Sequence, residues 1–583
     1  MDIIPFMKLR RAAQSCLCGL VLLVANTAAS DTLRLDIQGL DEEQQTNVRA
    51  YLSIQSMADQ PISSESRMRF LHNLAEDEIR RALEPFGYYN PSILVSLTQQ
   101  DDDWVARYEV DPGPPTLISR ADIDIQGDGG SDPEFMALLS RQPVREGAQL
   151  RHTEYEKLKS DLQSIAADRG YYRARFVRQR IEVDPSLNTA VVELHVDTAA
   201  RARIGEIRFS ESPISERLLK RYPQFAEGDY INTNRLVRLQ GALVDSDYFA
   251  DVEVRPLLNE MVDDRVPIDV KLTPRPRSLY QAGLGYGTDT GARMQLGLTR
   301  RWVNSRGHKL DTRLRLSEIR NDLSTSYMIP GGNPLTDRYG IRARYSDENS
   351  DTVNSEILAT GALWQKQVGD WERVLSLDLE QEKFSFNGDT REIRLLIPRA
   401  QWSRTVADDR LNTNQGYRLS FAVSGASDAL LSDVSFLQTL ASIKRVDSFG
   451  EKTRLLTRAD LGLTVTESFA NLPASHRFYA GGDASVRGYS YQSLGPRGST
   501  GNVIGGKYLV VGSAEVDYLV RENWRVAAFM DAGNAIDDVS DPLKTSVGAG
   551  IRWQSMVGPI RLDLAFPIED GGWRIHFTLG PDL

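Results

Sequence analysis

The chain has 583 residues, which is more than a single ordinary domain holds, and a net charge of −11 at pH 7. The acidic excess argues against nucleic acid as a partner. Both cysteines, Cys16 and Cys18, lie within the first 30 residues, so the rest of the chain has no disulfide, thiolate metal site or cysteine nucleophile.

Residues 1–30 have the composition of a secretory signal peptide. A basic start with Lys8, Arg10 and Arg11 precedes an apolar stretch and small residues at 28–30. A membrane anchor is the alternative, but the apolar stretch is short for a span. Past residue 31 no uninterrupted apolar run reaches the roughly 18 residues of a membrane helix, which leaves open a soluble exported protein and a membrane β-barrel.

One aromatic phrase recurs three times between residues 31 and 276. Each copy follows apolar residues spaced i, i+3 and i+4, which predicts a helix with one buried stripe that ends at the aromatic pair. Glycine or aspartate precedes each pair, and both accept the left-handed conformation of a helix stop. The copies are Gly87–Tyr88–Tyr89, Gly170–Tyr171–Tyr172 and Asp247–Tyr248–Phe249, with stripes Ile79/Ala82/Leu83, Leu162/Ile165/Ala166 and Leu239/Ala242/Leu243.

The same order of elements accompanies each copy. A short strand comes first, then a helical stretch, the striped helix and two alternating strands. Each unit is therefore predicted to be an α+β domain of order β-α-α-β-β, with helices covering one face of a small mixed sheet. The three predicted domains are residues 31–113, 114–199 and 200–276. They resemble POTRA domains, the periplasmic repeats that precede outer-membrane assembly barrels, in which a free sheet edge pairs with extended client strands.

Residues 277–583 alternate between apolar and polar side chains. The alternation is clear in 292–301, 310–317, 338–345 and 573–579, and such segments match the length of strands that cross a bilayer at a tilt. Every tryptophan except Trp104 lies in this half, mostly near segment ends, as interfacial residues do. We expect a transmembrane antiparallel β-barrel of about 16 strands.

The longest irregular connection of this barrel is expected at about 467–503 and carries Arg487. Alternation along "WRVAAFMDAGNA" turns Phe529, Asp531 and Gly533 inward, and Glu515 on the preceding strand also points inward. An inward carboxylate can accept a bidentate arginine. A loop folded into the lumen would therefore find an anchor there, whereas the alternative is a loop that hangs in solvent.

These motifs resemble the Omp85 superfamily of outer-membrane assembly and secretion barrels. Val486–Arg487–Gly488–Tyr489 matches the (V/I)RG(F/Y) motif of the lumen-inserted sixth extracellular loop. "FMDAG" at 529–533 matches the strand motif whose aspartate receives the arginine, with Phe529 and Gly533 as its other fixed positions, and "GSAE" at 512–515 resembles the preceding strand. The resemblance implies that Arg487 is held by Asp531, with Glu515 as a second acceptor.

Three POTRA-like units are most similar to the TamA branch of the superfamily, the outer-membrane subunit of the translocation and assembly module. That resemblance implies a protein of the outer membrane with its repeats in the periplasm. It implies a TamB-like, inner-membrane-anchored partner, unfolded outer-membrane client proteins such as autotransporters, contact with outer-membrane lipid, and no cofactor.

The seam is the place where the first and last strands of the barrel meet. Both of these strands are predicted to pair weakly there. The first strand places Gly283, Gly285 and Gly287 on its lumenal side, and the last strand ends at Gly580–Pro581, where proline cannot donate to a ladder. We hypothesise that the seam opens laterally and lends its edge to client strands. The alternative is that these glycines only relieve crowding at a barrel corner.

Two other transport functions stay open. A two-partner secretion pore would pass an unfolded exoprotein through the lumen, and a passive porin would carry no periplasmic repeats. An enzyme is not expected, because the six histidines are scattered without metal-ligand spacing and no G-x-S-x-G motif occurs. We therefore expect no catalytic, cofactor-binding or metal-binding residues.

Overall fold

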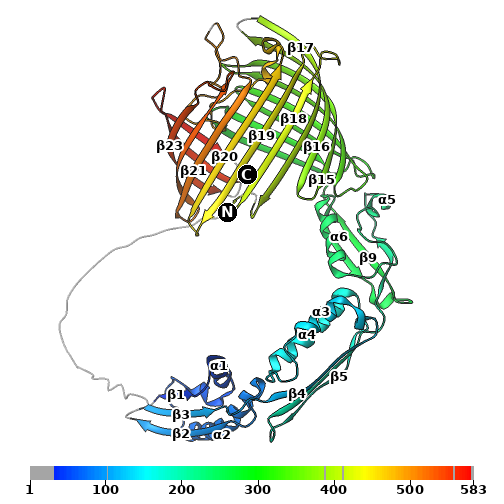
Figure 1. Ribbon diagram of the computed structural model, residues 1–583, viewed down its shortest axis with the longest axis vertical. Helices are drawn as coiled ribbons and strands as arrows, with labels where there is room; N and C mark the ends of the chain where they lie inside the picture. The colour runs from blue at the N-terminus through cyan, green and yellow to red at the C-terminus, as the bar shows by residue number, and fades with distance from the viewer. Residues whose placement is uncertain are drawn as a thin grey trace, which may run out of the picture. The chain divides into compact units, whose positions relative to one another are not determined.

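The computed structural model describes residues 32–100, 103–386, 389–409, 412–499, 501–555 and 558–579. The predicted signal peptide lies outside the described residues. The chain divides into two compact units, Met1–Ala202 and Arg203–Leu583. Figure 1 shows helix-covered small sheets and a large barrel, so the predicted fold class is confirmed. No helix in the described part of the chain has the length and apolar character needed to span a membrane.

The first unit contains two repeats of the same topology. In each, the first strand runs parallel to the third, which also pairs antiparallel with the second, giving the orders β1-β3-β2 and β4-β6-β5. The elements are β1 (Leu33–Gln38), α1 (Glu42–Tyr51), α2 (Glu65–Leu83), β2 (Ser92–Gln100), β3 (Asp103–Asp111), β4 (Leu117–Gln126), α3 (Pro133–Arg141), α4 (His152–Arg169), β5 (Arg175–Asp184) and β6 (Thr189–Asp197).

The third repeat opens the second unit and keeps this topology, with sheet order β7-β9-β8. Its first helix is only one turn long. The elements are β7 (Arg203–Phe209), α5 (Glu216–Leu219), α6 (Thr233–Asp245), β8 (Phe249–Pro256) and β9 (Arg265–Pro274). The predicted β-α-α-β-β order is confirmed in all three repeats.

The predicted helix stops are also confirmed. Gly87, Gly170 and Asp247 have φ angles of 85°, 84° and 64°, the left-handed conformation that ends a helix. The stripes before them face the cores: Ile79 and Leu83, for example, are fully buried against the sheet of the first repeat. The same local signal thus produces the same chain reversal three times.

Among the described residues, sixteen strands form one antiparallel sheet in sequence order. The strands are β10 (Ser278–Gly287), β11 (Gly291–Arg300), β12 (Lys309–Ser317), β13 (Arg320–Pro330), β14 (Asp337–Asn349), β15 (Asn354–Val368), β16 (Trp371–Phe386), β17 (Asp389–Ala407), β18 (Gly416–Ala426), β19 (Phe436–Phe449), β20 (Thr453–Thr466), β21 (Tyr508–Arg521), β22 (Trp524–Ile536), β23 (Lys544–Ser555), β24 (Gly558–Pro567) and β25 (Arg574–Leu579).

The two faces of this sheet differ in chemistry. Outward positions expose large apolar side chains, such as Leu284, which is 85% exposed. Inward positions bury charged groups in pairs, such as Arg454 and Asp517, whose Nη2 and Oδ2 atoms are 2.5 Å apart. This is the pattern of a barrel with a lipid-facing wall and a polar interior.

The connection between β20 and β21, residues 467–507, enters this interior, and we call it the lumenal loop. It extends four residues beyond the predicted range. Ala480 and Val486 of the loop are fully buried, and the loop contacts the inward faces of strands on several sides of the barrel. The loop therefore fills part of the lumen.

Candidate functional site: the lumenal loop and the barrel seam

Arg487 lies near the tip of the lumenal loop and binds Asp531 on β22. Its Nε and Nη2 atoms donate to the two oxygens of that carboxylate, at 2.7 and 2.9 Å. The backbone N–H of Arg487 donates to the same carboxylate at 3.1 Å. The Asp531 side chain is 0% exposed and that of Arg487 is 10% exposed, so this bidentate pair is shielded from solvent.

Two further carboxylates meet the same guanidinium. Nη1 of Arg487 lies 2.8 Å from Glu515 on β21 and 3.0 Å from Asp563 on β24. Arg552 on β23 donates to both carboxylates, at 3.0 Å to Glu515 and 2.5 Å to Asp563. Asp531 completes a network of three carboxylates and two guanidinium groups, which joins the loop tip to four consecutive strands.

Sequence reasoning missed Asp563 and Arg552. The available signal was their position: each is a charged residue within an alternating strand, and a barrel strand turns such residues away from lipid. That signal gives the direction of the side chain. It does not say which distant residue the side chain will meet.

Phe529 and Gly533, the other fixed positions of the β22 motif, each make a close contact near Arg487. The guanidinium carbon of Arg487 lies 3.4 Å from the centre of the Phe529 ring, a close cation–π contact. At Gly533 an added Cβ would lie 2.6 Å from the carbonyl oxygen of Val510 on β21. Glycine is therefore needed at 533 to let β21 and β22 approach each other.

The loop motif has its own geometric requirements. Gly488 has a φ of +94°, and an added Cβ there would lie 3.1 Å from Pro567 on β24. Its neighbour Val486 is fully buried, and the hydroxyl of Tyr489 donates to Glu569 at 2.8 Å. The tight turn thus places Arg487 between Val486, which is buried, and Tyr489, which is hydrogen-bonded to Glu569.

A second attachment holds the first part of the loop to β16. Glu382, which is fully buried, accepts hydrogen bonds from the backbone and hydroxyl of Ser475 and from Ser355. His476 Nε2 lies 2.8 Å from Glu380 Oε1. Sequence reasoning did not identify this attachment, although two carboxylates at i and i+2 on an alternating strand must share the inward face.

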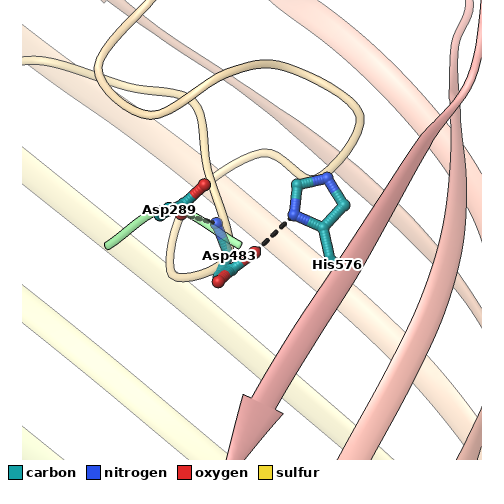
Figure 2. Close-up of side chains that lie close together, drawn as sticks. All are labelled: Asp289, Asp483 and His576. Carbon is teal, nitrogen blue, oxygen red and sulfur yellow. Dashed lines mark hydrogen bonds and ion pairs between the residues drawn. The ribbon is translucent and has the colours of Figure 1, made fainter. Parts of the chain in front are cut away.

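A third attachment lies at the seam (Figure 2). Asp483 of the loop bonds with His576 on β25, and its backbone N–H donates to Asp289 at 2.6 Å, in the turn after β10. The backbone N–H of Gly488 donates to His576 Nε2 at 2.7 Å. Nδ1 of His576 therefore carries the proton and donates to Asp483. We call Asp289, Asp483 and His576 the seam cluster.

The donor atoms of the seam cluster lie within 4.8 Å of one another, as they do in Glu380, Glu382 and His476. Both groups contain residue types that can bind metal ions. In the seam cluster, however, both imidazole nitrogens of His576 already have partners within the chain. The hydrogen bonds explain this arrangement without a cation.

The first and last described strands of the barrel, β10 and β25, meet at the seam. Within the described ranges no backbone pairing joins β10 to β25, whereas β10 pairs with β11 along its whole length. The Phe577 N–H instead donates to the Thr288 hydroxyl at 2.9 Å. Gly283, Gly285 and Gly287 lie on β10 at this edge, while Gly580 and Pro581 fall outside the described residues.

Known families match both parts of the chain. The Omp85 superfamily domain matches residues 281–582, and POTRA domain TamA domain 1 matches residues 34–112. The outer membrane protein assembly factor BamA of Nitratidesulfovibrio vulgaris is 22% identical over 390 residues, covering 63% of this chain and 49% of the relative. BamA of Neisseria meningitidis serogroup B is 21% identical over 539 residues, covering 79% and 66%. The chain thus spans about half to two thirds of the length of these relatives.

A solved structure has the same fold. The crystal structure of BamA from Haemophilus ducreyi lacking POTRA domains 1-3 matches with a TM-score of 0.68 at 19% identity, covering 80% of this chain and 99% of that one. These relatives are outer-membrane proteins, and this protein is likewise one of the outer membrane, with its repeats in the periplasm. Because the superfamily domain covers more than half of the chain, the protein belongs to the Omp85 superfamily.

Proposed function

We propose that this protein is an outer-membrane assembly factor that helps insert and translocate client proteins, autotransporters and other β-barrels among them. Three POTRA repeats before a sixteen-strand barrel support this role, as does the match of the first repeat to a TamA POTRA domain. By the same similarity, its partner is a TamB-like periplasmic protein anchored in the inner membrane. The role requires no catalytic residue, cofactor or metal.

The lumenal loop serves as an anchored internal element in this proposal. Arg487 is its anchor, with Asp531 and Glu515 as acceptors, and Val486, Gly488 and Tyr489 shape the turn that presents it. The ring of Phe529 contacts the anchor, and Gly533 allows β21 and β22 to approach each other. The buried ion pairs are strong enough to hold the loop in the lumen. Leaving one of these buried charges without its partner costs about 3–5 kcal/mol.

Client strands enter at the seam. The observation that carries this step is the missing ladder between β10 and β25 in the described part of the barrel. An unpaired edge presents free backbone N–H and C=O groups, which an incoming strand can pair with. Gly283, Gly285 and Gly287 leave that edge with few side chains, and Gly580–Pro581 are proposed to keep the opposite edge weak.

A reversible lock tests the seam. We would combine Thr288→Cys with Phe577→Cys, because these residues touch across the seam and the sequence after residue 30 contains no other cysteine. Leu284→Cys with Met294→Cys is the matched control, since this pair joins β10 to β11, which already form a ladder. The assay is surface exposure of an autotransporter client in oxidised and reduced cells.

The expected result is that oxidation of the seam pair blocks client insertion, that reduction restores it, and that the control pair has no effect. Normal insertion with a fully oxidised seam would show that lateral opening is wrong. A two-partner secretion pore predicts large single-channel conductance and export of one dedicated exoprotein through the locked barrel. If large conductance and exoprotein export were both observed, the protein would be a two-partner secretion pore and the assembly role would be wrong.

A further inference from the structure

A cavity of about 450 Å³ lies between helix α6 of the third repeat and the ends of β12, β13 and β14. The turn before β12 packs tightly against Tyr248 beside it: a Cβ added at Gly307 would lie 2.6 Å from the Tyr248 hydroxyl, which donates to the Gly307 carbonyl at 2.6 Å. We call this space the junction cavity. Both the repeat and the barrel contribute to it, and its size is typical of a ligand site.

Lys309 brings a positive charge to the junction cavity and forms no ion pair within the described part of the chain. Its ammonium donates to the Ser246 carbonyl at 2.6 Å and lies 4.8 Å from the centre of the Tyr248 ring. Neither group is an anion. The nearby Asp247 is already shared by Arg301 and Arg275, at 3.1 and 3.6 Å.

Two arginines add to this charge. Arg238 on α6 and Arg338 on β14 line the same cavity as Lys309, and Asp245 is the only carboxylate among its described lining residues. Arg338 is close enough to act electrostatically on Lys309, Tyr222 and Tyr248. Three cations thus face one carboxylate, so the junction cavity has an excess of positive charge.

We propose that the junction cavity binds a phosphate group. A guanidinium offers two parallel donors that match phosphate oxygens, and an ammonium adds a point charge. Phosphate groups are abundant at this level, because the cavity lies at the periplasmic ends of membrane-crossing strands. Met328, Ile329 and Leu335 also line it and would contact the glycerol and first methylene groups of a lipid. Lipid headgroups and free phosphate share the chemistry, and the experiment separates them.

Occupancy would join the third repeat to the barrel. Arg238 belongs to the repeat, whereas Lys309 and Arg338 belong to the barrel. A phosphate held by all three replaces their mutual repulsion with attraction on both sides of the junction. Ligand binding is therefore coupled to the stability of the contact between repeat and barrel.

The test uses the purified, delipidated full chain and measures binding by native mass spectrometry. One arm adds phosphatidylglycerol and the other adds inorganic phosphate. Arg238→Gln combined with Arg338→Gln removes two cations and keeps Lys309, which bonds the Ser246 carbonyl. Arg235→Gln is the matched control, because Arg235 lies on α6, is exposed and does not line the cavity.

Wild type and Arg235→Gln are expected to bind one phosphatidylglycerol per chain, and the double variant at least tenfold more weakly. Binding of inorganic phosphate with the same loss in the double variant, and no tighter binding of the lipid, would identify free phosphate as the ligand. Equal binding by the double variant and the wild type would overturn the proposal, as would the absence of binding in both arms.

A third variant separates binding from folding. Arg338→Lys keeps the positive charge and loses the paired donors of the guanidinium. This variant is expected to bind the phosphate group with intermediate affinity. All variants are first required to show the heat-modifiable gel mobility of a folded barrel. If the double variant is unfolded, Arg338→Gln alone replaces it, and wild-type affinity in that folded variant would overturn the proposal.

Discussion

At the scale of single residues, Arg487 satisfies more than one carboxylate at a time. Asp531, Glu515 and Asp563 converge on it, and Arg552 balances the last two. Like-charged carboxylates this close repel one another unless a cation lies between them. Arg487 therefore stabilises the inward face of the wall as well as the position of the loop.

Replacing Arg487 with glutamine is expected to release the tip of the lumenal loop. The change removes the guanidinium that Asp531, Glu515 and Asp563 share, at a cost of about 3–5 kcal/mol. Protease cleavage within 467–507 in the folded barrel should rise by more than tenfold. Arg497→Gln is the control, because Arg497 lies in the same loop, is exposed, and its side chain donates to the Gly501 carbonyl within that loop. Equal cleavage in both variants would show that the anchor is not needed.

The network also predicts that a simple charge swap fails. Arg487→Asp with Asp531→Arg preserves the pair itself, but it places an aspartate at 487 beside Glu515 and Asp563. The double variant should therefore remain as sensitive to protease as the single Arg487→Asp variant. If the double variant were as resistant to protease as wild type, the pair of Arg487 with Asp531 would be sufficient to hold the loop.

At the scale of elements, the helices of the repeats contain buried ionisable groups that couple stability to pH. His72 on α2 lies 3.1 Å from the Tyr108 hydroxyl in the core of the first repeat. Burial, and the positive charge of Arg69, lower the pKa of His72 below its ordinary value of 6.5. The folded repeat thus favours the neutral imidazole.

The sign of the pH effect follows from this shift. The stability that neutral His72 contributes is fully present above about pH 6.5. It is lost as the pH falls below that value, because the unfolded chain binds the proton first. Pulse proteolysis in urea, read from peptides within 32–111, should show a lower midpoint at pH 5.5 than at pH 7.5. His72→Gln should reduce that difference, and His195→Gln in the second repeat should leave it unchanged. A pH dependence that survives His72→Gln would refute this assignment.

The elements themselves were largely predictable, because their signals are local. A left-handed stop at Gly87 depends on a few neighbouring residues, and strand alternation near Asp531 needs no knowledge of distant segments. Contacts between segments far apart in sequence were less accessible. The attachment of His476 to Glu380 joins residues separated by 96 positions, and no local pattern specifies that distance.

At the scale of the whole molecule, no ladder joins the first and last strands among the described residues of the barrel. Asp289 follows the first strand, His576 belongs to the last, and Asp483 of the lumenal loop contacts both (Figure 2). The loop therefore spans the seam from inside. Since the loop is also held to β16 and to β21–β24, closure of the seam depends on elements around the whole barrel.

Loss of the seam cluster is expected to loosen the seam while the rest of the barrel stays folded. His576→Phe removes the bond to the Gly488 N–H, worth about 0.5–1.5 kcal/mol, and the bond to the Asp483 carboxylate, worth about 1.5–3 kcal/mol. Hydrogen exchange of β25 amides should become at least about tenfold faster, while β16 amides keep their protection. His308→Phe is the control: it breaks a bond to Tyr327 of 2.8 Å, away from β25. If β25 exchange is the same in wild type and His576→Phe, the loop does not hold the seam, and closure must then depend on the direct contact between Phe577 and Thr288.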